Sequence, residues 1–313
     1  MTKRTVVLSS ATGMLLTMFS SIIDAQLPIR LATSSAVESV TFVPALRSQG
    51  NANTDATVYD TLLELSGFAE QLQRVPEAVA RSIESAISAD GSMEPFEPRD
   101  YPFLKQVVPA AFAGDVLHNA VVEQLQSKLS LDAAKELAVF YTSPLGERLR
   151  TAELENSVLE NFERFNHWHK TQGVSSLSNE RQVVLEELEK ALLLTEGAVD
   201  AMIGMQVAMQ VSMTPILPPE QRRNASDLMS DARRQRSGLT KHYLDNSLAT
   251  LGFVFQQQSL DQLRSYTKLL NTEAGQLYVV AINDGLSRGL IYAAENLGNT
   301  FQKLLEGRIG QGA

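Results

Sequence analysis

Hydrophobic positions recur at helical spacing along most of the chain. From Thr57 onward, apolar residues stand three or four positions apart over long stretches, as they do on one face of an α-helix. Alternation of apolar and polar residues, which indicates strands, is weak, and its best example is the short run VESVTFVP before that point. The pattern therefore predicts an all-α protein.

The helical pattern contains an internal repeat. The segment SLDAAKELAVFYTSPLG (130–146) matches SLDQLRSYTKLLNTEAG (259–275): both begin Ser-Leu-Asp, both end in Gly, and their numbers differ by 129 throughout. Upstream, LLELSGFAEQL (62–72) lies over LLLTEGAVDAM (192–202) at an offset of 130. Two separate blocks in nearly the same register predict that one helical unit occurs twice.

Each copy of the repeat predicts a short helix with a capped start. Ser130 and Ser259 stand where a hydroxyl can accept from the first free amides of a helix. Gln262 follows Ser259 by three positions, which is the spacing of a capping box. The apolar spacing predicts that these short helices end near Tyr141 and Leu270.

A joint and a longer helix follow in each copy. Ser143 with Pro144 is a typical helix start, because proline lacks only an amide that the first turn leaves free, and Thr272 takes this place in the second copy. Gly146 and Gly275 would let a neighbouring helix come close. The predicted apolar stripes of the longer helices are Leu154, Val158, Phe162 and Phe165 in the first copy and Leu290, Leu297, Phe301 and Leu304 in the second.

These elements predict two tandem helical repeats, residues 57–172 and 178–307, packed together as one layered helical bundle. The polar segment KTQGVSSLSNE would join them, with Ser178 as the cap of the next helix. Proline clusters at 95–102 and 215–219 interrupt the helical pattern once in each half. The expected order is the same in both halves, because each cluster precedes its short helix.

The first residues have the pattern of an export signal. Lys3 and Arg4 precede a mostly apolar run, and Ala25 offers a small residue for cleavage. We therefore expect a signal peptide over 1–25, cleaved after Ala25, then a flexible leader over 26–56, and a periplasmic location with no transmembrane segment after cleavage. A buried N-terminal helix or an uncleaved anchor is the alternative.

Composition narrows the function classes. The 313 residues are 44% hydrophobic, carry a net charge of −9 and contain no cysteine. The absence of cysteine excludes disulfides, a lipid-anchored start, thiolate metal sites and cysteine nucleophiles. The acidic balance does not suit a general nucleic-acid binder, which is basic. We expect no nucleic-acid partner.

The segment LLELSG, followed about eighty positions later by FYTSPLGERL, resembles a bacterial exported family catalogued as domain of unknown function 2059. The resemblance covers about residues 110–165, and the second copy, LLNTEAGQLYV, lacks the aromatic pair and the proline. It implies a periplasmic, all-helical protein without an assigned activity. It supplies no catalytic residues.

A methionine stripe offers either a copper site or core packing. Thioethers bind Cu(I), and four of them share one helix face: Met202, Met205, Met209 and Met213. At the offset of 130, the first half has only aliphatic residues: Leu72, Val75, Val79 and Ile83. Because methionine also fills irregular gaps in a core, the repeat favours core packing.

The HWH motif is a second candidate for metal binding. His167 and His169 lie two positions apart beside Glu163, and residues two apart on a helix point in different directions. We therefore expect a solvated helix end in which Trp168 packs inward. Glutamate pairs such as Glu153 with Glu155 lie in charged helical stretches and predict no facing pair of catalytic carboxylates.

The densest basic patch consists of Arg222, Arg223, Arg233, Arg234 and Arg236. It could bind phosphate, lipid headgroups or an acidic partner, unless Asp227 and Asp231 neutralise it along the helix. The corresponding crossing of the first half, MEPFEPRD, is acidic. The two halves, or two copies of the chain in a homodimer, could therefore meet there.

No nucleophile elbow, phosphate loop, dinucleotide fingerprint or zinc-protease helix occurs in the sequence. We predict no catalytic residues, no cofactor and no metal, and a periplasmic protein that binds a protein, a peptide or an envelope component. One alternative is a carrier of lipid or of a small apolar ligand between the repeats. Another is an envelope hydrolase, whose best candidates are Tyr141, Ser143 and Arg148 near the joint.

Overall fold

The computed structural model describes residues 52–90, 98–156, 161–217, 219 and 222–309. Within these residues every regular element is a helix, and no strand is present. The predicted all-α class is confirmed. The expected signal peptide and residues 93–97 of the acidic crossing MEPFEPRD lie outside the described residues.

The helices of the first half are α2 (Ala52–Leu65), α3 (Phe68–Asp90), α4 (Tyr101–Ala111), α5 (Gly114–Lys128), α6 (Leu131–Tyr141), α7 (Pro144–Asn156) and α8 (Phe162–Thr171). Those of the second half are α9 (Asn179–Leu192), α10 (Leu194–Met213), α11 (Ala225–Val254), α12 (Leu260–Leu270) and α13 (Glu273–Ile309). Short 3₁₀ turns cover Pro98–Asp100, Val174–Ser176 and Thr214–Ile216.

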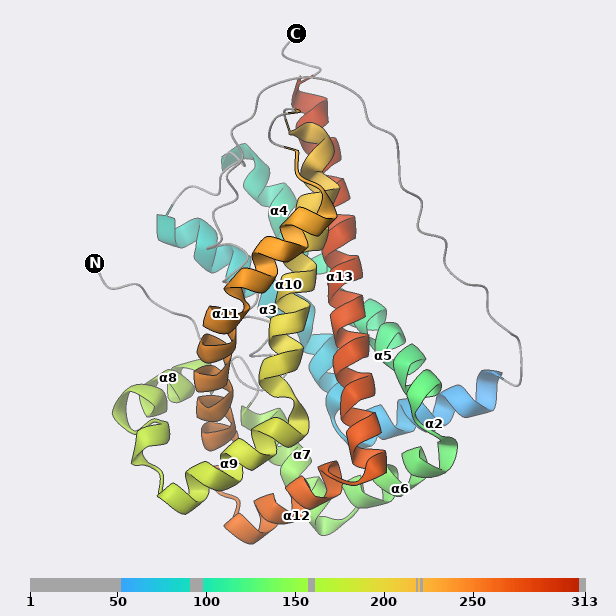
Figure 1. Ribbon diagram of the computed structural model, residues 1–313, viewed down its shortest axis with the longest axis vertical. Helices are drawn as coiled ribbons and strands as arrows, with labels where there is room; N and C mark the ends of the chain where they lie inside the picture. Colours follow the sequence, from blue (N-terminus) through green and yellow to red (C-terminus); the bar gives the residue numbers. More distant parts are fainter. Residues whose placement is uncertain (1–51, 91–97, 157–160, 218, 220–221, 310–313) are drawn as a thin grey trace.

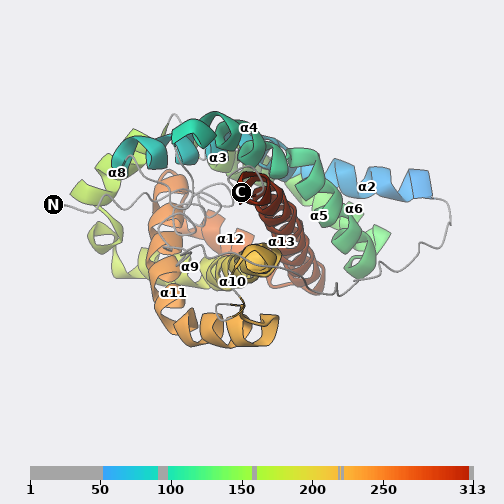
Figure 2. The same ribbon diagram turned by 90° about the horizontal axis from the view of Figure 1, so that it is seen from above.

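Helix α13 is the central element. It runs beside α10 along the long axis of the molecule, while the short helices α6, α9 and α12 lie across one end (Figure 1). Seen from above, α13 lies between α3–α5 on one side and α9–α11 on the other (Figure 2). The last helix of the second half therefore packs against helices of both halves.

Glycines allow α13 to approach its neighbours closely. A Cβ atom built on Gly285 would lie 2.5 Å from the Cα atom of Val121 in α5, and one on Gly289 would lie 3.0 Å from a methyl group of Leu117. On the α10 side, a Cβ atom on Gly298 would lie 2.6 Å from the Cβ atom of Ser212. The small residues thus permit backbone distances that larger side chains would prevent.

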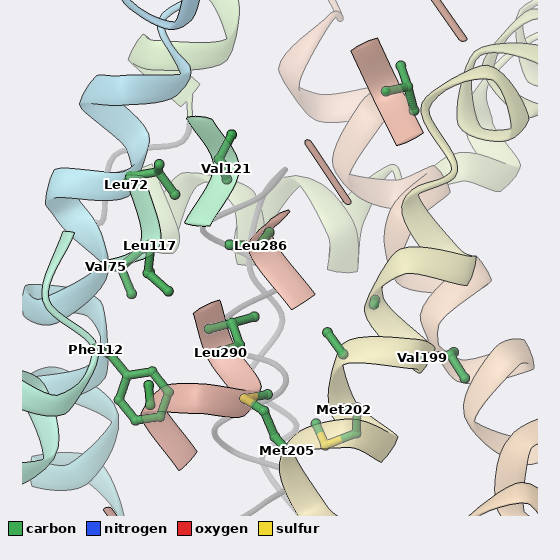
Figure 3. Packing of buried hydrophobic residues seen from close by; sticks show 14 of the residues in the cluster. Leu72, Val75, Phe112, Leu117, Val121, Val199, Met202, Met205, Leu286 and Leu290 are labelled. Atoms are coloured by element: carbon green, nitrogen blue, oxygen red, sulfur yellow. The ribbon is translucent and has the colours of Figure 1, made fainter. Parts of the chain in front are cut away.

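The apolar core draws on both halves. Figure 3 shows Phe112 of the first half beside Leu290 of α13, with Met202 and Met205 of α10 beyond it, and Leu72 belongs to the same cluster. All of these side chains are buried. A smaller cluster of Phe165, Trp168, Ala249 and Phe253 joins α8 to α11.

The predicted helix starts are confirmed. The Ser130 and Ser143 hydroxyls accept from the amides three residues on, at 3.2 and 3.1 Å. Ser178 caps α9, Thr272 accepts from the Gly275 amide, and Ser259 forms the full capping box with Gln262. The short helices end at Tyr141 and Leu270, as the spacing predicts.

Three boundaries differ from the expectations. Helix α2 begins at Ala52, inside the segment expected to be a leader. The longer helix of the first copy is not continuous, because α7 ends at Asn156 and α8 begins at Phe162. In the second copy the helix is continuous, although Leu305 rather than Leu304 is the buried residue of its last turn. Val158 lies outside the described residues.

The upstream blocks also shift by one turn. The first chain reversal is at Gly67, with φ 79°, whereas the second is at Leu193, with φ 51°. Gly197, which the sequence places over Gly67, lies instead inside α10, against Asn283. Because four residues are about one helical turn, the apolar face keeps its direction despite the shift.

Polar contacts fix the bend between α9 and α10. The Asn283 side chain of α13 donates to the carbonyl oxygen of Leu192 at 3.2 Å, and the buried Glu189 carboxylate accepts from the Thr195 amide at 2.9 Å. The helices meet at 45°, with Leu193 in the left-handed region. In the described part of the chain, no single helix has the length and apolar character to cross a membrane, while this bent pair does by length and composition.

Candidate functional site

The two joints of the predicted repeat meet in the structure, and polar side chains gather where they meet. The Phe140 ring at the end of α6 stacks on Tyr266 of α12, with centroids 6.1 Å apart and planes 5° from parallel. The ring centroids of Tyr141 and of Tyr278 in α13 are 6.3 Å apart. Residues more than a hundred positions apart therefore form one aromatic contact region.

The geometry of each helix places these side chains. Tyr141 is the last residue of α6, where the chain turns toward α7. Tyr266 follows the buried Leu263 by three positions on α12, so both lie on the inward face. Tyr278 lies near the start of α13. All three tyrosines are at most 6% exposed.

The three tyrosine hydroxyl groups interact electrostatically with one carboxyl group, that of Glu153. The Tyr141 and Tyr266 side chains interact with each other and with the Glu153 side chain of α7. The Tyr278 side chain interacts with Tyr141 and with Ser66, which directly follows α2. We call these five residues the tyrosine–glutamate cluster.

Burial dominates the proton affinities in the cluster. It raises the pKa values of Tyr141 and Tyr266 well above their ordinary value, and it raises the pKa of Tyr278 to about 12. Burial raises the pKa of Glu153 to about 8, although the hydrogen bond from Tyr266 acts in the opposite direction. The shifts therefore favour the neutral form of each of these side chains.

The candidate residues for a hydrolase do not converge. Tyr141 is buried in the tyrosine–glutamate cluster, whereas the Ser143 hydroxyl caps α7 by accepting from the Gly146 amide. Arg148 is exposed. The groups of the tyrosine–glutamate cluster can bind protons and form hydrogen bonds in the interior of the protein.

The arginine patch is largely occupied by contacts within the chain. Arg222 donates to the carbonyl oxygens of Leu217 at 2.9 Å and Pro215 at 3.2 Å. Arg223 and Arg234 both pair with Asp231. Of the two aspartates expected to neutralise the patch, Asp231 pairs with two arginines.

The remaining charges of the patch differ in their contacts. Arg236 reaches across to Asp200 of α10. Asp227 does not pair with an arginine in the described residues but takes part in the cap of α11, where its amide and carboxylate bind Asn224. Arg233 is exposed and forms no ion pair with any residue the structure describes. Of the arginines in the patch, Arg233 is therefore the best placed to pair with an acidic group of a partner.

The methionine and histidine interpretations are confirmed. All four methionines of the α10 stripe are buried in the main core, at most 7% exposed. His167 and His169 are exposed at the end of α8, while Trp168 packs against Phe253. Over the described ranges, no group of three histidine or acidic side chains is placed to hold a metal ion.

Sequence reasoning missed Glu153, Tyr266 and Tyr278. The sequence pattern places Glu153 in a charged stretch together with Glu155, yet it stands four positions after the buried Leu149, on the inward side of α7. A glutamate in register with the apolar face was the available signal. Comparison with protein-family models, with curated proteins and with solved structures gave no match, so the resemblance to domain of unknown function 2059 stays a prediction.

Proposed function

We propose that this protein is exported and acts by binding a protein, a peptide or an envelope component, without catalysis. The observation that carries the proposal is that the candidate polar residues make contacts within the protein. Tyr141 lies in the interior, Ser143 caps a helix, and Arg222 holds a loop through carbonyl oxygens. The residues that the sequence offered for chemistry thus serve to hold the helices together.

The proposal includes a duplicated helical unit. Helices α6 and α12 are both 11 residues long and begin 129 positions apart, each after a capping serine. Helix α2 packs on α6 in the first half, and α9 packs on α12 in the second. These shared features support two tandem copies, in which the letters that persist are those that shape the backbone.

The exposed arginines of α11 are the proposed contact surface. Arg233 and Arg234 are exposed neighbours on a long helix, and Asp231 compensates only part of the charge around them. A guanidinium group binds carboxylates and phosphates in a bidentate manner, so an acidic partner suits this surface. A second copy of the chain is one such partner, since the chain is acidic overall.

Crosslinking in living cells tests the proposal. The full chain, including its first 25 residues, serves as bait in the bacterial envelope, and the variant Arg233→Glu with Arg234→Glu is compared with Arg288→Glu, an exposed arginine of α13. We expect a crosslinked partner that the double variant loses and Arg288→Glu keeps. The mass of the purified chain should correspond to residues 26–313.

Other results would contradict the proposed function. If both variants keep the same crosslinked partner, the arginine surface of α11 is not the contact. If the wild type yields no partner but retains a lipid in native mass spectrometry, the lipid-carrier alternative replaces the proposal. Thermal unfolding of each variant shows whether a lost crosslink reflects lost folding.

A further inference from the structure

Helix α11 has an exposed side that continues well beyond the arginines. The N-terminal half of this helix lies at the outer edge of the molecule (Figure 2). Exposed residues recur there at steps of three and four positions, so they form one strip along the helix. We call this strip the outer face of α11, and it consists of Arg233, Arg234, Ser237, Lys241, Leu244 and Asp245.

The two ends of the outer face carry opposite charges. Arg234 and Asp245 are eleven positions apart, which is close to three full turns, so both lie on the same side of the helix, about 16 Å from each other. At that distance they cannot pair within one helix. Asp245 forms no ion pair with any residue that the structure describes, and neither does Arg233. Both ends can therefore pair with charges of another molecule.

The middle of the outer face leaves room for a close neighbour. Ser237 and Gly238 separate the two charged ends, and a Cβ atom built on Gly238 would meet no atom within 4 Å outside the adjacent helix backbone. Leu244 is 36% exposed, and no other large hydrophobic side chain of α11 is exposed in the described chain. A neighbour at this position would cover Leu244 and remove its apolar surface from water.

We propose that the partner of this surface is the outer face of α11 in a second copy of the chain. A two-fold axis between Gly238 and Lys241 makes the two helices antiparallel, and it places Arg234 of each copy beside Asp245 of the other. Arg233, one position earlier, lies within reach of the same carboxylate. This inference rests on the proposed function, because it identifies the occupant of the contact surface proposed there.

The other charges near the axis fit the same arrangement. Arg234 already pairs with Asp231, but a guanidinium group has five donors and can bind a second carboxylate as well. Lys241 faces Gly238 of the partner, where no side chain obstructs its flexible stem. The lysines of the two copies nevertheless carry like charges near the axis, so Lys241→Gln should strengthen the dimer.

The contact area determines what kind of dimer is expected. A single pair of crossing helices buries little surface and belongs to the transient interfaces, which bury less than about 1,200 Å² in total. Exposed ion pairs contribute modestly to affinity and are screened by salt. We therefore expect a reversible dimer that forms at high protein concentration and is stronger at low ionic strength.

Exchange of the charges tests this dimer in the purified full chain by analytical ultracentrifugation. One variant is Arg233→Glu with Arg234→Glu, and the other is Asp245→Arg. Each alone brings like charges together across the axis and should weaken self-association at least about tenfold. In an equal mixture the introduced glutamates face the introduced arginine, so the two variants should associate with each other. The control Arg288→Glu, on the exposed side of α13, should behave as the wild type.

Two results would overturn the dimer. One is a wild type that stays monomeric at every concentration in low salt, and the other is a mixture that associates no better than its components. If crosslinking in cells then still gives a protein partner that the double arginine variant loses, the proposed binding function stands with a different occupant. If that crosslink is absent too, both proposals fail.

Thermal unfolding of each variant separates lost association from lost folding. Asp245→Arg is the more secure variant, because Asp245 has no ion pair to lose among the described residues. If the double arginine variant unfolds early, Asp245→Arg alone decides the question. A folded Asp245→Arg chain that dimerises as the wild type does would contradict the arrangement.

Discussion

Gly146 and Gly275 each lie close to the backbone of the preceding short helix, one in each joint. A Cβ atom on Gly146 would lie 2.2 Å from the carbonyl oxygen of Phe140, and one on Gly275 would lie 2.2 Å from that of Leu269. In both cases the clash is with the backbone of the preceding short helix, which cannot rotate away as a side chain can. The glycines therefore permit the sharp reversal between the two helices.

Replacing either glycine by alanine should destabilise the fold by a similar amount. We expect Gly146→Ala and Gly275→Ala each to lower the free energy of unfolding by about 1–3 kcal/mol, because overpacking against backbone forces a displacement. Urea unfolding at constant pH measures the change. A neutral effect at one site and a large effect at the other would show that the two joints are not equivalent.

The sequence separation of each contact explains which site residues the sequence could predict. Ser130, Ser143 and Ser259 act on amides three positions away, so their roles are readable from local sequence. Tyr266 meets Phe140 and Tyr141 across the fold, and no local pattern reports that contact. The candidate site was therefore predicted only at Tyr141, as part of a joint.

Among the elements, α11 contains a glycine without a packing role. The helix changes direction along its length (Figures 1 and 2), and it contains the pair Ser237–Gly238, a sequence at which helices often kink. No atom outside the helix backbone lies within 4 Å of a Cβ atom built on Gly238. Nothing in the surrounding structure thus requires glycine at this position.

Gly238→Ala should therefore stabilise the protein. Alanine is favoured over glycine within a helix by about 0.5–1 kcal/mol, and the open space removes any steric cost. Thermal unfolding should show a higher midpoint than the wild type, opposite in sign to Gly146→Ala. A lower midpoint would mean that α11 needs the bend, and that straightening it disrupts the packing of its lower part on α8.

The neighbouring helices explain why one apolar stripe forms the continuous helix α13, whereas a similar stripe forms the two helices α7 and α8. Helix α13 has α4, α5, α6 and α10 beside it, so it is supported along its length. Helices α7 and α8 each contact α11 instead, and Trp168 anchors α8 in a separate small cluster. Apolar spacing in the sequence predicts helical character in both places, whereas continuity depends on the neighbours and was not predictable.

For the whole molecule, the shared core makes the halves interdependent. Leu117 and Val121 of the first half pack on α13 of the second, at the closely spaced Gly285 and Gly289. Either half by itself would expose this apolar face to water. The two halves of the chain therefore share one hydrophobic core.

Residues 57–172 and 178–307, produced separately, should each lack a cooperative thermal transition. The reason is that uncovered apolar surface lowers the stability of each piece by more than a marginal fold can lose. Circular dichroism during heating measures the transition, and the control is the two pieces produced together, which should reassemble. A sharp transition in either isolated piece would show that it folds alone.

The central place of α13 also sets a time order for folding. Helix α5 is complete at Lys128, but the helix that covers it begins only at Glu273. At usual rates of synthesis the interval is on the order of ten seconds, during which the face of α5 that packs on α13 has no native partner. A chain in this state is open to aggregation until its last helix covers the core.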